Sequence, residues 1–403
     1  MAEMSDAHCF RGARTLPVSL GLALLGFVLL AVGWSTARSE TLFAYLVAFA
    51  FLVALALGAL IFLMIAYVVR ARWSVVLRRL NEAIVSVFPL LALLFVPIAC
   101  GLSEIYSWVE PATAFSGREL ALLRHKAPYL NGSAFLARSA LYWVVWTIAS
   151  WLIGGSRTRA AHRAERRSDD DDALNARERR LSGAFLPLVS LTLTFASFDW
   201  LMSLQPLWSS SLFGVYFFAG GFVSSFGLLA FLAFLAHRSP GGDALIRPAH
   251  FHALGRLMLG FTIFWAYCAF FQALLIQIAD KPAEVSFYTT RLRSGWRALT
   301  WSLAALRFVV PFVLLLPREL KFRPGAMALL GLLLVCGEYL DVLWLVSPAQ
   351  NGTAGPTSLW NFAALLAVGG SAVAFASWRL RGHSWVPLED PQLATSVAYR
   401  SPL

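Results

Sequence analysis

Long apolar runs dominate the chain, and short charged segments separate them. A transmembrane helix needs about 20 apolar residues, and ten runs reach roughly that length. The predicted spans are Leu16–Thr36, Leu42–Val69, Ala83–Leu102, Phe135–Gly154, Ala184–Leu204, Ser210–Ala236, Phe251–Ile278, Leu299–Pro317, Ala326–Val346 and Ser358–Trp378. The pattern predicts an all-α, polytopic membrane protein with about ten transmembrane helices.

Composition and charge agree with this class. Hydrophobic residues make up 59% of the chain and charged residues only 14%, whereas soluble domains have about 25% charged residues. The net charge of +11 comes from basic residues in the short connections, mostly on the side of the N-terminus. The positive-inside rule then predicts that both termini lie in the cytoplasm. This distribution argues against binding of nucleic acid.

Two spacings recur in the two halves of the chain and indicate a parallel internal repeat. An aspartate precedes a proline by seven residues in both predicted helices 5 and 9, and an arginine precedes an aromatic residue by four near helices 4 and 8. The pairs are Asp199 with Pro206, Asp341 with Pro348, Arg138 with Tyr142, and Arg297 with Trp301. Such repeats are common in membrane proteins.

The repeat predicts four regions. Residues 1–41 hold an N-terminal tail and peripheral helix 1, and residues 42–209 form a first four-helix bundle. Residues 210–350 form a second four-helix bundle, and residues 351–403 hold peripheral helix 10 and a cytoplasmic tail. The strongly charged segment 155–183 is predicted to be a solvated, partly disordered cytoplasmic loop. A docking surface for another subunit is the alternative for this segment.

Histidine and cysteine positions argue against a resident metal cofactor. A membrane cytochrome b needs histidine ligands inside its spans, and none of the seven histidines lies in the middle of one. The four cysteines are far apart in sequence, so neither an iron–sulfur cluster nor a zinc site is indicated. The sequence therefore predicts no metal site.

Several charged residues fall within predicted spans, among them Asp199, Arg256, Arg307, Glu338 and Asp341. A charge at the bilayer centre costs at least about 3 kcal/mol, so such residues usually face protein or water. Glu338 and Asp341 lie one turn apart on one helix face, and Arg307 lies at a similar depth in the preceding helix. We expect an Arg307–Glu338 ion pair. Asp199 occupies the matching depth in the first repeat. These residues either neutralise one another structurally or take part in proton or quinone chemistry.

Aromatic residues gather in predicted helices 5–7 and include Trp200, Trp265 and Tyr267. They either line a flat cofactor site or pack and face lipid, as most aromatics in spans do.

The stretch Thr194–Trp208 reads T-F-A-S-F-D-W-L-M-S-L-Q-P-L-W. It resembles the D-W-x-M-S-L-x-P-x-W segment of membrane subunits of bacterial alternative complex III, in the family of NrfD and polysulfide-reductase membrane subunits. The closest resemblance is to the second of the two quinone-binding subunits. Further matches are Tyr129-Leu130-Asn131 with Phe135 and Arg138, Trp265-Ala266-Tyr267 with Gln272, Pro282 and Glu284 with Tyr288 and Arg291, and Asp341 and Trp344 with Pro348.

The resemblance implies a non-haem subunit of a quinol:cytochrome c oxidoreductase in a bacterial inner membrane, which is not catalytic alone. Its partners would be a multihaem cytochrome c, an iron–sulfur protein and a sister NrfD-like subunit, and its ligand would be a quinone or quinol. The proton-route candidates are Asp199, Glu338, Asp341 and Arg307. The quinone-site candidates are Trp200, Trp265, Tyr267 and Gln272.

One departure from the family pattern weakens an inner proton path through helix 7. The family often starts this helix with Asp-Leu-Gly-Asn, where this chain has Ala253-Leu254-Gly255-Arg256. Two rival interpretations stay open: a secondary transporter, and a structural scaffold within the same complex.

Overall fold

The computed structural model describes residues 10, 12–154, 168–293, 295–350, 356, 358–388 and 390–401, and residues 168–174 by their backbone alone. This part of the chain is almost entirely helical and contains no β-strand. Ten of its helical segments are long and apolar enough to cross a membrane. The predicted all-α, multi-pass architecture is therefore confirmed.

The spans follow one another in chain order. They are α2 (Thr15–Thr36); α3 (Arg38–Val68); η1 (Arg72–Leu77) with α4 (Arg78–Val85), α5 (Phe88–Leu94) and α6 (Val96–Cys100); α10 (Gly132–Ile153); α12 (Ser168–Trp200) with η2 (Met202–Leu204); α13 (Phe213–His237); α15 (Pro248–Ala279); α17 (Trp296–Leu303) with η3 (Ala304–Val309) and α18 (Val310–Leu315); α20 (Pro324–Val346) with η4 (Ser347–Ala349); and α21 (Leu359–Ala364) with η5 (Leu365–Gly369) and α22 (Gly370–Leu380).

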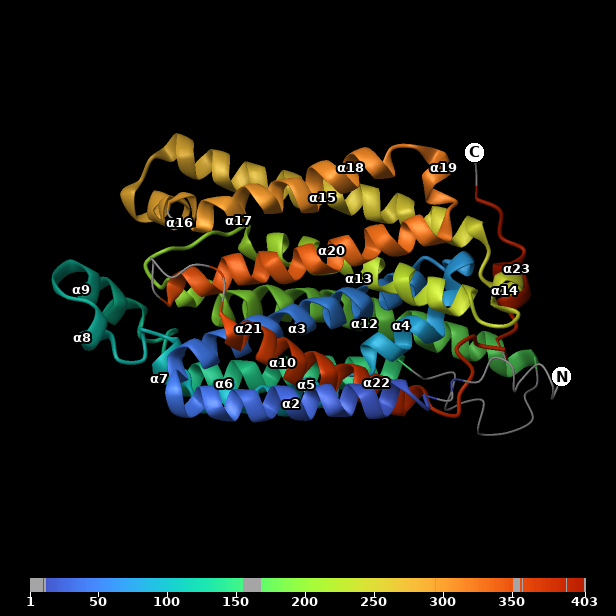
Figure 1. Cartoon of the computed structure of the whole chain (residues 1–403), viewed down its shortest axis with the longest axis horizontal. Coiled ribbons are helices and arrows are strands. Elements are labelled where there is room, and N and C mark those ends of the chain that lie inside the picture. The colour runs from blue at the N-terminus through green and yellow to red at the C-terminus, as the bar shows by residue number, and fades with distance from the viewer. Residues whose placement is uncertain are drawn as a thin grey trace.

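Helix contacts divide the spans into two groups of four and one peripheral pair (Figure 1). The first group joins α3, the α4–α6 span, α10 and α12. The second joins α13, α15, the α17–α18 span and α20. The groups meet mainly through α3 against α13, and α2 packs with the α21–α22 span beside them.

Two local features differ from the predicted elements. The third span is broken into short helices because Pro89 and Pro97 each remove a backbone donor and clash with the preceding turn. Residues 168–183, predicted to be loop, instead form the start of α12. Residues 173–181 are Ala, Leu, Arg or Glu at all but one position, and these residues favour helix, so the loop prediction was wrong there. The rest of that predicted loop, residues 155–167, lies outside the described residues.

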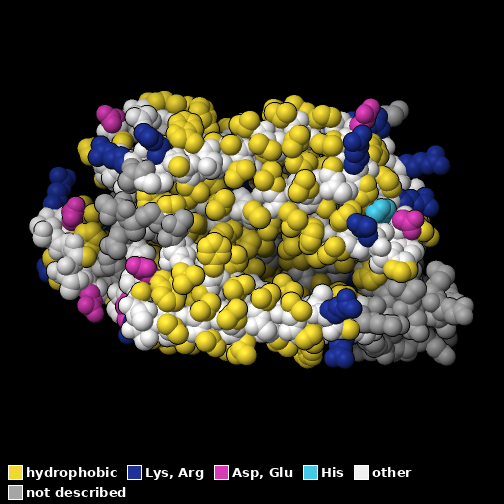
Figure 2. All heavy atoms as spheres, viewed as in Figure 1, with side chains coloured by type: hydrophobic (Ala, Val, Ile, Leu, Met, Phe, Trp, Pro, Cys, Tyr) yellow, Lys and Arg dark blue, Asp and Glu magenta, His cyan; other side chains and the backbone are white. Residues whose placement is uncertain are grey.

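The helices run between two polar ends. The described chain termini lie together at one end, here called the terminal end, with α14 (Gly242–Leu245), α19 (Arg318–Lys321) and α23 (Leu393–Val397) (Figure 1). The opposite, distal end carries α7 (Leu102–Ile105), α8 (Pro111–Ala114), α9 (Gly117–Lys126) and α16 (Pro282–Leu292). Charged side chains gather at both ends, and apolar side chains cover the surface between them (Figure 2). This is the surface expected of a chain solvated by lipid.

Candidate functional site

A buried arginine joins two carboxylates inside the second bundle. Arg307 Nη2 lies 2.7 Å from Glu338 Oε2, and Arg307 Nη1 lies 2.6 Å from Asp341 Oδ2. The three residues, here called the Arg307 cluster, are 1%, 1% and 2% exposed, respectively. The predicted Arg307–Glu338 pair is confirmed. Asp341 joins the same guanidinium, which the sequence interpretation did not anticipate.

Local backbone features place the guanidinium between α13 and α20. Arg307 lies on η3, a π-helical turn within the eighth span, and such turns often occur at functional sites. A Cβ atom on Gly220 would lie 2.8 Å from Glu338 Oε2, and one on Gly337 would lie 2.8 Å from Arg307 Cγ. Both glycines are therefore needed for the close approach of the two helices to the ion pair.

We expect Gly220→Ala to destabilise the folded protein by about 1–3 kcal/mol, because an added methyl group overpacks the buried ion pair. Thermal unfolding in detergent, followed by tryptophan fluorescence, measures this effect. Gly260→Ala on α15 is the matched control, since a Cβ there meets nothing within 4 Å. Equal stability of the two variants would contradict the close contact between Gly220 and the Glu338 carboxylate.

Asp341 also has two aromatic hydrogen-bond donors. The Tyr216 hydroxyl donates to Asp341 Oδ1, and Trp265 Nε1 donates to Asp341 Oδ2 at 3.2 Å. The Arg307 guanidinium carbon lies 4.4 Å from the centre of the Trp265 ring, a distance typical of a cation–π contact. Asp341 is thus the member of the cluster that links the ion pair to surrounding aromatic residues.

The charges of the Arg307 cluster do not balance. One guanidinium faces two carboxylates, and both carboxylates are almost fully buried. A net charge in a dry site is expensive, so the cluster is neutral only when one carboxyl group holds a proton. Its geometry therefore provides a place where a proton can be held and released.

An apolar cavity of about 610 Å³ reaches Asp341. Its wall includes three of the four quinone-site candidates, namely Trp265, Tyr267 and Gln272. The fourth, Trp200, lies in the other bundle and is not among the lining residues. The full lining is Tyr216, Ile263, Trp265, Ala266, Tyr267, Ala269, Phe270, Gln272, Ala273, Tyr288, Leu292, Thr300, Leu303, Ala304, Phe308, Asp341 and Trp344.

Polar groups form a short chain at the distal side of this cavity. Ser210 Oγ donates to Gln272 Oε1 at 2.8 Å, and Gln272 Nε2 donates to the Tyr288 hydroxyl at 3.1 Å. Tyr288 lies on α16, outside the spans, and burial raises the pKa of its hydroxyl. Tyr216 and Tyr288 were not among the predicted site residues. Tyr288 belongs to the predicted family motif of Pro282, Glu284, Tyr288 and Arg291, and this motif could have identified it as a site residue.

The cavity adjoins the surface that faces lipid. Tyr267 and Phe270, which line it from α15, are 55% and 67% exposed. Large exposed apolar side chains between the polar ends are solvated by lipid in a membrane protein. A ligand dissolved in the bilayer therefore has an apolar route to Asp341.

The corresponding aspartate of the first bundle has a different setting. Arg138 holds Asp199 with two hydrogen bonds, from Nε at 2.8 Å and Nη2 at 3.0 Å, and the Tyr142 hydroxyl donates at 2.6 Å. Here one cation balances one carboxylate. Trp200 donates from Nε1 to Ser139 Oγ at 2.9 Å and stacks on Trp143 within a packed aromatic core. The Asp199 site is thus a neutral, well-bonded pair.

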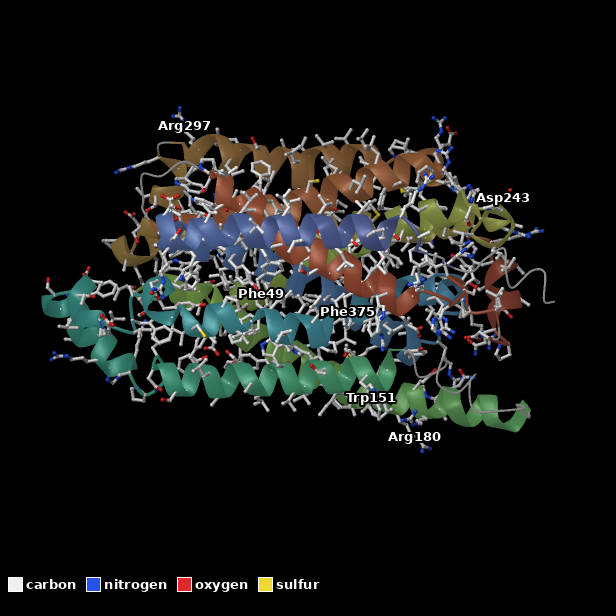
Figure 3. All side chains as sticks on the ribbon, turned by 60° about the horizontal axis from the view of Figure 1, so that its bottom comes forward. Phe49, Trp151, Arg180, Asp243, Arg297 and Phe375 are labelled. Carbon is white, nitrogen blue, oxygen red and sulfur yellow. The ribbon has the colours of Figure 1, made fainter. Side chains whose placement is uncertain are left out.

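The repeat expected from spacing holds only in part. Each aspartate binds an arginine and a tyrosine hydroxyl. The arginine comes from α10 in the first bundle but from η3 in the second. Arg297, which matches Arg138 by spacing, is exposed and points away from the helices at the distal end (Figure 3). The arginine that binds Asp341 is therefore not the one at the repeat position.

A second buried arginine supports the distal side of the cavity. Arg291 on α16 donates from Nε to the Trp344 carbonyl at 2.9 Å and from Nη2 to the Leu345 carbonyl at 2.8 Å. Its guanidinium lies 3.5 Å from the centre of the Phe287 ring. Complete burial lowers the pKa of Arg291. Through these contacts Arg291 fastens α16 to the end of α20, next to Trp344 in the cavity wall.

Within the described residues, no three His, Cys, Asp or Glu side chains are grouped as metal ligands would be. No protein-family model matches the sequence, and no curated protein matches it either. The resemblance to the NrfD-like family therefore rests on the motifs themselves, and these motifs include Trp265, Gln272, Tyr288 and Asp341 around one cavity.

Proposed function

We propose that this chain is the non-haem, quinol-binding membrane subunit of a bacterial quinol-oxidising electron-transport complex of the alternative complex III type. One observation carries the proposal: an apolar cavity next to lipid ends at a buried carboxylate in a cluster with one carboxyl group in excess. Quinol needs these two features together, a lipid-accessible apolar site and a proton acceptor.

The cavity suits a quinol ring in size and chemistry. Its volume of about 610 Å³ lies within the usual range for small-molecule sites, about 300–1,000 Å³. Trp265, Tyr216 and Trp344 offer flat faces for the ring, and Gln272 and Tyr288 offer polar groups for its oxygens. An isoprenoid tail would leave past Tyr267 and Phe270 into lipid.

In this proposal Asp341 accepts a proton from the bound quinol. Oxidation of a quinol releases two protons and two electrons. Asp341, the ionisable carboxylate in the cavity wall, would take the protons one at a time and release the first to the outer side before it accepts the second. Arg307 and Glu338 adjust the charge around it, because a proton gained by Asp341 alters the balance of the whole cluster. The electrons would pass to the iron–sulfur and haem groups of partner subunits.

The proposal includes an orientation. The excess of basic residues in the connections of the terminal end supports a cytoplasmic position of both chain termini by the positive-inside rule. The distal end, with α16, then faces outward. Asp341 lies towards the distal end of α20, so protons taken from quinol would leave on the outer side of a bacterial inner membrane.

Purification of the tagged chain from its native membrane in mild detergent tests the assignment. We expect a multihaem cytochrome c, an iron–sulfur protein and a sister NrfD-like subunit to accompany it. Mass spectrometry identifies the partners. Recovery of the chain alone, or with partners that carry no redox groups, would overturn the respiratory assignment and favour a transporter.

Filling the cavity tests the quinol site itself. We expect Ala273→Trp to raise the apparent KM for quinol by about tenfold or more, because the new indole occupies space that the ring requires. Ala273 lines the cavity, whereas Leu275, two residues later on α15, is exposed and does not line it. Leu275→Trp is therefore the matched control and should leave the KM unchanged. Similar KM values for the two variants would place the quinol elsewhere.

A further inference from the structure

A basic cavity of about 320 Å³ lies at the terminal end, between the end of α3 and the start of the fifth span. Four arginines contribute to its wall: Arg70, Arg72, Arg78 and Arg179. Arg70 lies in the connection between the second and third spans, Arg72 is the first residue of the third span, and Arg179 lies near the start of the fifth span. All of them therefore lie near the level at which a bilayer has its phosphate groups.

One of these arginines has a carboxylate partner. Arg78 pairs with Asp390, and its guanidinium lies 5.0 Å from the centre of the Tyr67 ring. Arg70, Arg72 and Arg179 form no ion pair with any residue whose side chain the structure describes. Three arginines that line one concave site and form no ion pair with a described carboxylate favour a positive potential that attracts an anion.

The backbone at Arg70 is also unusual. Its φ angle is +52°, in the left-handed region that residues other than glycine rarely adopt. Such strain persists only where the surroundings enforce it, and it often marks a binding site. The turn ends α3 abruptly and keeps Arg70 and Arg72 on the wall of the same cavity.

An apolar groove continues from this basic cavity along the membrane-spanning helices. The groove has a volume of about 480 Å³ and shares Ala66 and Ala71 with the basic cavity. Phe62, Phe222, Phe226 and Phe261 line it, from α3, α13 and α15. Arg256 also lies on its wall, and the structure gives Arg256 no ion pair within the described residues.

We propose that the two cavities together bind one anionic phospholipid. Its phosphate lies among Arg70, Arg72 and Arg179, and one acyl chain lies in the aromatic groove. A basic pocket at the cytoplasmic level, next to an apolar groove between spans, has the chemistry that recognises anionic lipid headgroups. A free phosphate ion would pair with the arginines but would leave the apolar groove empty. The groove therefore favours a lipid over a free ion as the ligand.

The site is separate from the quinol cavity. The basic cavity and its groove share no lining residue with the cavity at Asp341. The groove does contact α3 and α13, the helices through which the two bundles meet. A bound lipid would therefore hold this bundle interface together at the terminal end.

Lipid titration of the delipidated, purified full chain tests the proposal. The probes are dioleoyl phosphatidylglycerol, dioleoyl phosphatidylcholine with the same acyl chains, and inorganic phosphate. Native mass spectrometry measures binding, and thermal unfolding measures stabilisation. We expect phosphatidylglycerol to bind and to raise the unfolding midpoint, and phosphatidylcholine and inorganic phosphate to do neither.

Two sets of variants identify the site. Combined Arg70→Gln, Arg72→Gln and Arg179→Gln should weaken phosphatidylglycerol binding by about tenfold or more, since each basic residue adds to attraction for an anionic headgroup. Ala66→Phe should weaken it by obstructing the junction with the groove. The charge-matched control combines Arg118→Gln, Arg124→Gln and Arg297→Gln, which are exposed at the distal end, and should bind as the unmodified chain does.

Each other outcome overturns the proposal. Equal binding of phosphatidylglycerol and phosphatidylcholine would show that headgroup charge does not contribute to binding. Stabilisation by inorganic phosphate equal to that by phosphatidylglycerol would show a free-anion site. An equal loss in the distal control would show attraction by net charge alone, and unchanged binding in the Arg70, Arg72 and Arg179 variant would exclude these residues.

Discussion

In the proposed quinol-oxidising complex, Asp341→Asn is expected to lower turnover by about 10²–10⁴-fold, the usual contribution of a positioned general base. Asparagine keeps the shape of the side chain and can still accept a hydrogen bond from Tyr216 or Trp265, so the cavity should stay intact. It cannot take up a proton. The measurement is the rate of quinol:cytochrome c reduction in membranes, divided by the amount of complex present.

Two control variants separate the loss of a proton acceptor at Asp341 from a general effect of changing a carboxylate. Asp243→Asn changes an exposed carboxylate at the terminal end (Figure 3) and should leave activity unchanged. Asp199→Asn changes the neutral pair of the first bundle, and we expect it to lower stability more than turnover per assembled complex. Full turnover by the Asp341→Asn complex would contradict the proton role and would favour a structural scaffold.

Arg307→Met is expected to destabilise the chain by about 3–5 kcal/mol, because it leaves Glu338 and Asp341 buried without a cation. Methionine fills similar space, so the loss reports the missing charge more than a cavity. The midpoint of thermal or denaturant-induced unfolding in detergent, followed by tryptophan fluorescence, measures it.

Removal of the remaining charges should reverse most of this loss. The combined variant Arg307→Met, Glu338→Gln and Asp341→Asn carries no charge in the cluster, and replacement of a whole buried ion pair is often neutral for stability. Arg297→Met changes an exposed arginine of the same span and should shift stability by no more than about 0.5 kcal/mol. If Arg307→Met alone matches this control, the cluster is more hydrated than its burial indicates.

Local signals in the sequence located several parts of the site. The cost of charge in a bilayer singled out Arg307, Glu338 and Asp341 before any contact was known, and the one-turn spacing placed the two carboxylates on one face. The same reasoning singled out Asp199, but it gave no means of separating a balanced pair from an unbalanced cluster. That difference depends on how many partners reach each carboxylate in space.

The partners that reach Asp341 from other helices could not be identified from the sequence. Spacing matched Arg297 to Arg138, yet the π-helical turn of η3 directs Arg307 into the bundle instead and leaves Arg297 exposed. Tyr216 reaches Asp341 from α13, a helix more than a hundred residues away in sequence. A periodic pattern reports which face of a helix is apolar, but it does not report which helix lies opposite.

The sequence by itself determined the solvent and the class of this protein: long apolar runs must be solvated by lipid, and in lipid the backbone must satisfy its own hydrogen bonds within helices. It also determined which charged residues had to find partners. Only the tertiary structure decided which partners they found, because the packing of α13, α15, η3 and α20 brings together residues that are distant in sequence. That packing made one aspartate a neutral structural pair and set the other at the end of a cavity open towards lipid.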